Sequence, residues 1–118
     1  MRINEFNNIQ EFIDMYDENS TVDCEKHIGL EFEYHKQMYR MCREPKIVCG
    51  KYVLPTLPNG KIGRYAVYKV FHHMQPNQEY ETIGWYTDMD DLLNNCFIEG
   101  KPFKEVIMED DTRMDGMD

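Results

Sequence analysis

One stretch constrains the fold more than any other, residues 28–43, with the sequence IGLEFEYHKQMYRMCR. Its first half alternates apolar and polar residues, and this period of two places four apolar side chains on one face of a β-strand: Ile28, Leu30, Phe32 and Tyr34. A turn at His35-Lys36 sets the register, with Tyr34 opposite Gln37, Phe32 opposite Tyr39, Leu30 opposite Met41 and Glu31 opposite Arg40. The pairing gives an apolar inner face and an opposite-charge pair on the outer face. The stretch therefore predicts a β-hairpin, although His-Lys replaces the Asn-Gly or Asp-Gly that two-residue turns favour.

Helices are predicted near both ends of the chain. Apolar residues at spacings of three and four predict a helix over residues 4–18, with Asn4 as its N-cap. Thr87 is predicted to cap a second helix of two to three turns, and Pro102 suits the first position of a short third helix. The side chains expected inside are Met89, Leu92, Leu93 and Cys96 in the second helix and Phe103, Val106 and Ile107 in the third.

Further strands are predicted after the hairpin. Residues 64–71 and 79–86 alternate as strands do, and the first of them carries apolar side chains on both faces, which favours a central position. Residues 46–54 suggest a short strand broken at Gly50, and residues 55–63 are turn-rich. The order of elements predicts an α+β fold, with an antiparallel sheet of three to five strands and an N-terminal helix and two C-terminal helices packed on one face.

The length of 118 residues is that of one domain, expected over residues 1–107. Residues 108–118 have no apolar periodicity and carry five acidic side chains, so they are expected to form a flexible acidic tail. No apolar run approaches the length of a membrane helix, and the N-terminus is too polar for a signal peptide. We therefore expect a cytoplasmic protein with reduced cysteines.

The net charge of −9 is distributed unevenly. Residues 1–25 carry one basic and seven acidic side chains, and residues 70–118 carry three basic and twelve acidic ones. Residues 26–69 between them carry nine basic and three acidic side chains. Such charges are commonly a solvated face, but acidic ends can also form one negative surface that imitates a row of phosphates and binds a basic protein partner. The candidate residues are Asp14, Asp17, Glu18, Asp88, Asp90, Asp91, Glu109, Asp110 and Asp111.

The basic middle of the chain offers a different surface. Tyrosines interleave with basic residues there, a composition that suits single-stranded nucleic acid on a sheet face. The acidic total argues against this interpretation, because nucleic-acid binders usually have a basic total. The candidate residues are Arg40, Arg43, Lys46, Lys51 and Arg64.

No catalytic motif is present, so no enzymatic function and no catalytic residue are predicted. The single serine, Ser20, is in a region expected to end a helix, and His72-His73 is interpreted as one packed and one exposed histidine. No metal is favoured either, because reduced thiols explain the cysteines. A structural zinc site is the alternative, since three thiolates and one imidazole flank the hairpin: Cys24, His27, Cys42 and Cys49.

Two segments resemble parts of a known group of proteins. The segment LEFEYHKQMYRM resembles the EFEYNGKKYRI segment of small uncharacterised proteins from phages and conjugative elements of Gram-positive bacteria. The run WYTDMDDLLNNCFIEGKPFKEVI resembles the closing segment of the same proteins, whereas residues 44–63 have no counterpart in them. The resemblance implies an α+β fold and a mobile-element origin. It implies no functional residues, because that family has no assigned activity.

These observations lead to two hypotheses. The first is a non-enzymatic protein-binding module of phage or mobile-element origin, in its sharpest form an acidic inhibitor that blocks nucleic-acid binding by a host defence nuclease, as anti-CRISPR proteins do by analogy. The alternative is a small regulatory protein that binds nucleic acid through the basic β-face, with or without a structural zinc. A specialised site is expected on the outer face of the hairpin, near His27, Glu31, Arg40 and Cys42, or along the acidic helix after Thr87.

Overall fold

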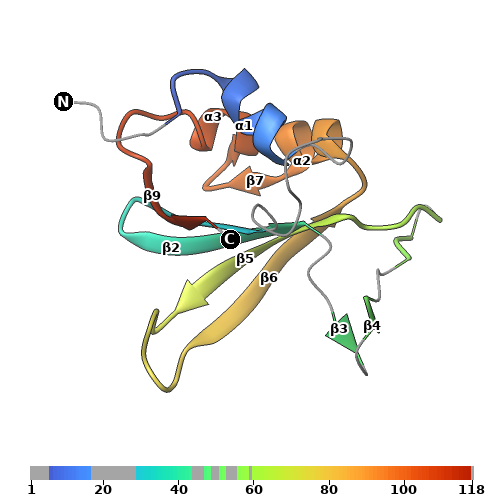
Figure 1. The fold of residues 1–118 in the computed structure, drawn as a ribbon, viewed down its shortest axis with the longest axis horizontal. Helices are drawn as coiled ribbons and strands as arrows, with labels where there is room; N and C mark the ends of the chain where they lie inside the picture. The colour runs from blue at the N-terminus through green and yellow to red at the C-terminus, as the bar shows by residue number, and fades with distance from the viewer. Residues whose placement is uncertain are drawn as a thin grey trace.

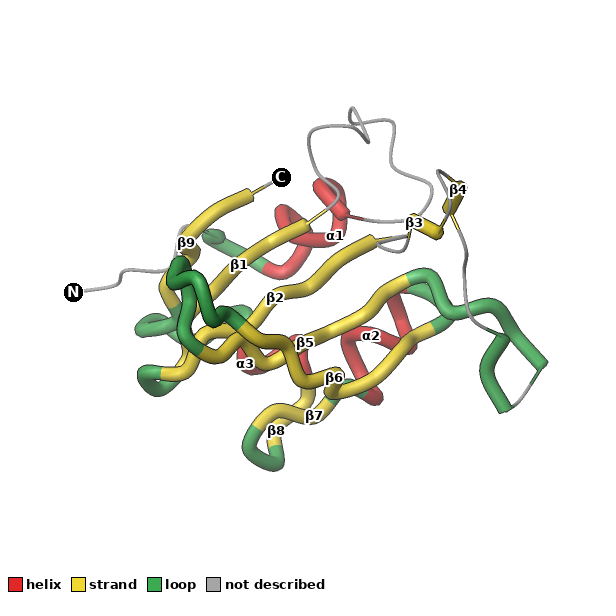
Figure 2. The backbone as a smooth tube through the Cα atoms, turned by 90° about the horizontal axis from the view of Figure 1, so that it is seen from below, coloured by secondary structure: helices red, strands yellow, loops and turns green. Residues whose placement is uncertain are grey.

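The structure is a computed structural model that describes residues 6–16, 29–43, 47–48, 51–52, 56–58 and 60–117. Its elements in chain order are α1 (Ile9–Tyr16), β1 (Gly29–Tyr34), β2 (Gln37–Arg43), β3 (Ile47–Val48), β4 (Lys51–Tyr52), β5 (Tyr65–Phe71), β6 (Glu79–Tyr86), α2 (Met89–Asn95), β7 (Phe97–Ile98), β8 (Lys101–Pro102), α3 (Phe103–Val106) and β9 (Arg113–Met117). Five strands form one antiparallel sheet in the order β6-β5-β2-β1-β9 (Figure 2). The three helices lie on one side of this sheet (Figure 1), so the α+β prediction is confirmed.

The β1–β2 hairpin has the register that the alternation predicts. Phe32 pairs with Tyr39, and Glu31 pairs with Arg40. The turn residues His35 and Lys36 have φ angles of 49° and 67°, in the left-handed region that two-residue hairpin turns require. The His35 ring stacks on Tyr34 with centroids 3.8 Å apart, which is one contact that holds this non-glycine turn in place.

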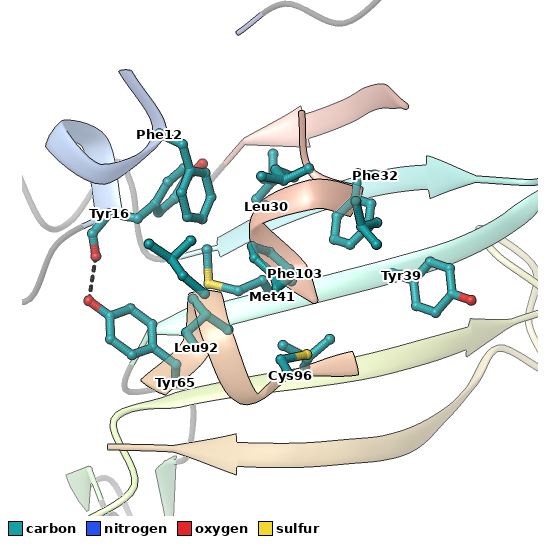
Figure 3. Close-up of a cluster of buried hydrophobic side chains, with 14 of the residues drawn as sticks. Phe12, Tyr16, Leu30, Phe32, Tyr39, Met41, Tyr65, Leu92, Cys96 and Phe103 are labelled. Atoms are coloured by element: carbon teal, nitrogen blue, oxygen red, sulfur yellow. Dashed lines mark hydrogen bonds between the residues drawn. The ribbon is translucent and has the colours of Figure 1, made fainter. Parts of the chain in front are cut away.

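The core lies between the helices and the inner face of the sheet (Figure 3). Phe12 and Tyr16 of α1 and Phe103 of α3 are fully buried against the hairpin. The carbonyl oxygen of Tyr16, at the end of α1, accepts hydrogen bonds from the Tyr65 hydroxyl at 2.6 Å and from Arg43 Nη1 at 3.3 Å. These donors satisfy a helix-end carbonyl that would otherwise be buried without a partner. The inward stripes predicted for α2 and α3 are also confirmed.

All three predicted helix starts need correction, and Pro102 is the N-cap of α3 and not its first residue. α1 begins at Ile9, because the Asn8 side chain accepts the Glu11 N–H at 3.0 Å, and the predicted cap Asn4 lies outside the described residues. The N-cap of α2 is Asp88 and not Thr87. The Asp88 carboxylate accepts the Asp91 N–H at 2.8 Å, and the Asp91 carboxylate reaches back to the Thr87 N–H at 2.9 Å.

The prediction of a flexible tail over residues 108–118 is wrong for residues 113–117, which form β9 and pair with β1. Met114 is buried opposite Phe32, and the buried Thr112 hydroxyl donates to the Val106 carbonyl oxygen at 2.6 Å. These contacts hold the segment in the sheet. Its sequence is too short and too polar to show the alternation of apolar residues that predicts a strand.

The remaining strands refine the predicted topology. β5 pairs with β2 on one side and β6 on the other, so it lies inside the sheet as its two apolar faces predict. Residues 46–54 contain two strands of two residues each, β3 and β4, which pair with each other and not with the main sheet. β7 and β8 form a short hairpin that the sequence did not predict. Among the described residues, no helix is long and apolar enough to cross a lipid bilayer.

Candidate functional site on the open face of the sheet

The sheet face opposite the helices has no helix over it in the described part of the chain (Figure 1). Glu31 of β1, paired with Arg40 of β2, has its side chain on this open face, because the neighbouring Leu30 and Phe32 point into the core. Asp115 of β9 and His73, which follows β5, reach the same place. A charged cluster is therefore assembled from four separate segments of the chain.

The centre of this cluster is one nitrogen atom of His73. Its Nε2 atom lies 3.0 Å from Asp115 Oδ2 and 3.3 Å from Glu31 Oε2. The nearest ligand atoms of the three side chains all lie within 4.8 Å of one another. Each side chain is only 23–28% exposed, so water screens the charges less than at an open surface. Two carboxylates thus converge on one imidazole.

An arginine lies beside the outer oxygen of each carboxylate. Arg40 Nη1 donates to Glu31 Oε1 at 2.9 Å, and Arg113 Nη2 lies 3.8 Å from Asp115 Oδ1. Arg40 also donates from Nε to the Cys42 sulfur at 3.0 Å. Gly29 makes room for this arrangement, because a Cβ atom there would lie 2.7 Å from Arg40 Nη2. The hydrogen bond from Arg40 therefore orients Glu31, whereas Arg113 donates to Glu33 Oε2 at 3.2 Å and is only an ion-pair neighbour of Asp115.

His73 is carried on a strained turn. His72 and Met74, on either side of it, have φ angles of 56° and 61°, which cost non-glycine residues of order 1 kcal/mol each. The Met74 N–H donates to Gln78 Oε1 at 2.7 Å, one bond that holds the turn. The side-chain atom His73 Nδ1 is buried and has no hydrogen-bond partner among the described residues. His72 is exposed and His73 mostly buried, as the sequence predicts for this pair.

A pocket of about 450 Å³ lies beside the cluster. Its lining includes His73 and Asp115 together with Lys36, Gln37, His72 and Arg113. Four lining residues are cationic or can become so, namely Lys36, His72, His73 and Arg113, while Glu33 and Asp115 add two carboxylates. A small anion would therefore bind at the cationic side chains of the pocket.

Several of the acidic residues predicted to bind a partner make hydrogen bonds within the chain, and others are exposed. Asp88 and Asp91 cap α2, and Glu109 accepts a hydrogen bond from Lys101 at 2.7 Å. Burial raises the pKa of Asp91, but hydrogen bonds from Asn95 and Thr87 outweigh it, so this pKa lies below the usual value. Four of the predicted residues are described and exposed, on α1, on α2 and in the turn before β9: Asp14, Asp90, Asp110 and Asp111. Asp17 and Glu18 lie outside the described residues.

The predicted basic face is not formed as expected. Arg43 is 5% exposed on the inner face of the sheet, where it donates to the Tyr16 carbonyl oxygen. Arg40 is on the outer face, because residues three apart on a strand point to opposite sides. Arg64 is partly exposed beside β5, while Lys46 and the Lys51 side chain lie outside the described residues. Arg40 and Arg43 therefore cannot contact one nucleic-acid strand together.

The predicted thiol zinc site falls mostly outside the described residues, which exclude Cys24, His27 and Cys49. Cys42 is a buried cysteine on the outer face, where its sulfur accepts a hydrogen bond from Arg40 Nε. Sequence reasoning placed Glu31 and Arg40 on that face but missed His73 and Asp115 as their neighbours. In the sequence, only the adjacent pair His72-His73 drew attention to His73. Nothing pointed to Asp115, because it lies in the segment that was expected to be a flexible tail.

Comparison with known proteins finds no matching family model, no matching curated protein and no matching solved structure. No matched protein therefore supplies a function for this chain.

Proposed function

We propose that the protein is a non-enzymatic, protein-binding module that acts in the cytoplasm and engages a basic partner through its helix side. We name the surface concerned the acidic helix face, defined by Asp14, Asp90, Glu105, Asp110 and Asp111. These exposed carboxylates belong to the three helices and the turn after α3, and the helices lie on one side of the sheet (Figure 1). This placement is the observation that carries the proposal.

Two lysines on the helix side offset part of this charge. Lys101 Nζ is paired with Glu109 at 2.7 Å, and Lys104 Nζ donates to the Asn94 side chain at 2.8 Å. A net negative surface of this kind speeds association with a basic partner, and the attraction weakens with salt. Exposed carboxylates at the ends of short helices can also take the place of phosphates in a nucleic-acid groove.

The sharpest form of the proposal is an inhibitor that occupies the nucleic-acid groove of a host defence nuclease. The acidic helix face supports it, as does the resemblance to small proteins of phages and conjugative elements. The comparison with anti-CRISPR proteins is one of size and charge, and it identifies no specific nuclease.

The test is inhibition of target-DNA cleavage by a panel of purified RNA-guided nucleases, with the protein added before the guide RNA. The variant carries Asp90→Lys and Asp111→Lys, which spare the capping residues Asp88 and Asp91. The matched control carries Glu79→Lys and Glu81→Lys, the same charge change on exposed positions of β6.

We expect the native chain and the β6 control to inhibit at least one nuclease at low salt, and the helix-face variant to lose that inhibition. Equal inhibition by both variants would exclude the acidic helix face as the binding surface. A mobility shift of labelled oligonucleotide by the protein alone would instead indicate the nucleic-acid-binding alternative.

A further inference from the structure

In the charged cluster on the open sheet face, two carboxylates share one nitrogen atom. Glu31 Oε2 and Asp115 Oδ2 both approach the single atom His73 Nε2, at 3.3 Å and 3.0 Å. A neutral imidazole has one proton to donate from that atom, so it cannot give each carboxylate its own linear hydrogen bond. Two carboxylate oxygens held this close together repel each other unless a cation lies between them.

The distances from His73 Nε2 to the two carboxylate oxygens are close to those between the ligand atoms of a bound metal ion. Zinc bonds to imidazole nitrogen and carboxylate oxygen are about 2.0–2.2 Å long, so ligand atoms at tetrahedral corners lie about 3.3–3.6 Å apart. The nitrogen–oxygen separations of 3.0 Å and 3.3 Å are close to these values, and the ligand atoms of all three residues lie within 4.8 Å of one another. We propose that Glu31, His73 and Asp115 bind a divalent transition-metal cation, with zinc the ion that best suits one nitrogen and two oxygen ligands.

Arginine side chains lie beside the two carboxylates that we propose as ligands. Each carboxylate turns one oxygen toward His73, while its other oxygen lies next to an arginine: Arg40 at 2.9 Å for Glu31 and Arg113 at 3.8 Å for Asp115. A hydrogen bond like that from Arg40 to Glu31 orients a metal-binding carboxylate. The arginines also offset the two negative charges, so we expect a binding site of moderate affinity.

Three protein ligands leave one position open on a tetrahedral ion. The pocket of about 450 Å³ is lined by His73 and Asp115, so it adjoins the site, and Lys36 and Arg113 also line it. Water fits that position, and a small anion such as phosphate or a carboxylate would contact Lys36 and Arg113 there, although Glu33 also lines the pocket and accepts a hydrogen bond from Arg113.

The metal would also join three parts of the fold. Glu31 belongs to β1, Asp115 to the edge strand β9, and His73 to the turn between β5 and β6. An ion bound only by the folded chain stabilises it by mass action, so zinc should raise the melting temperature and protect β9 from hydrogen exchange. This site is on the opposite side of the sheet from the acidic helix face, and the two proposals can fail separately.

The experiment is calorimetric titration of chelator-treated protein with zinc chloride, on the native chain and on Glu31→Gln and Asp115→Asn. These isosteric changes keep the side-chain shape and remove the charged ligand. His72→Gln is the matched control, since it changes a histidine in the same turn that lies outside the cluster. Cobalt substitution identifies the ligands, because cysteine ligation gives an intense near-ultraviolet charge-transfer band that oxygen and nitrogen ligands lack.

We expect one equivalent of zinc to bind the native chain and His72→Gln, with affinity lowered at least tenfold in the other two variants. Native affinity in Glu31→Gln and Asp115→Asn would overturn the proposal, as would an intense cobalt–thiolate band. If a variant does not fold, the native chain is used instead. The NMR signals of its His73 ring are then followed during the zinc titration. Ring signals that stay unchanged at saturating zinc would refute the site.

Discussion

Replacing Met114 by alanine tests whether the C-terminal segment is part of the folded sheet. Met114 is 8% exposed and pairs with Phe32 across β9 and β1. Truncation of a buried methionine costs about 2–5 kcal/mol of unfolding free energy, and an edge strand can relax, so we expect the lower end, about 2 kcal/mol. For a domain of this size that loss lowers the melting temperature by about 6–10 °C.

The matched control is Met74→Ala, because Met74 is 85% exposed and the chemical change is the same. Surface truncations of this kind change the unfolding free energy by about 0.5 kcal/mol or less. Urea titration of both variants, followed by tryptophan fluorescence and circular dichroism, gives the two free energies. Equal stabilities of the two variants would refute the packing of β9, and residues 113–117 would then be the flexible tail that the sequence suggests.

Two further predictions concern the helix start and the hairpin. Asp88→Ala removes the N-cap of α2 and should cost about 1 kcal/mol in urea titration, whereas Asp90→Ala should cost much less, because Asp90 is exposed and Asp88 accepts the capping hydrogen bond. A larger loss in Asp90→Ala would contradict this cap. Burial raises the pKa of Tyr34 to about 12, and the nearby Glu109 carboxylate adds to the shift. The unfolded tyrosine ionises near its ordinary value of 10.0, so the stabilising contribution is complete below that pH and is lost as the pH rises toward 12. The urea midpoint should therefore fall from pH 9 to pH 11.5 more steeply in the native chain than in Tyr34→Phe, and parallel slopes would contradict the shift.

The two edges of the main sheet differ in how they avoid pairing with other chains. β6 is exposed over Glu79, Tyr80 and Glu81, and its pairing with β5 is interrupted by a bulge between Val67 and Tyr68. β9 is short, carries Arg113 and Asp115, and is also irregular in its pairing with β1. Charges, short length and bulges of this kind discourage edge-to-edge association. A zinc ion on Asp115 would hold the β9 edge more firmly in place.

The start of α2 shows why some details could not be predicted. Thr87 and Asp88 are adjacent, and both residue types are good N-caps. The choice depends on which neighbour Asp91 can reach, and Asp91 binds the Thr87 N–H at 2.9 Å while Asp88 accepts the Asp91 N–H. The difference is one residue along the chain, which apolar periodicity cannot resolve.

The sequence by itself determined the local parts of this protein. The register of the β1–β2 hairpin, the pairing of Glu31 with Arg40 and the buried stripe of α2 follow from the spacing of apolar residues within single segments. Only the tertiary structure decided the charged cluster, because His73 and Asp115 are 42 residues apart in the chain. Spacing within a strand fixes which face a side chain occupies, but it says nothing about which distant strand lies beside it. The pairing of β9 with β1 supplied that information and brought two carboxylates to one histidine.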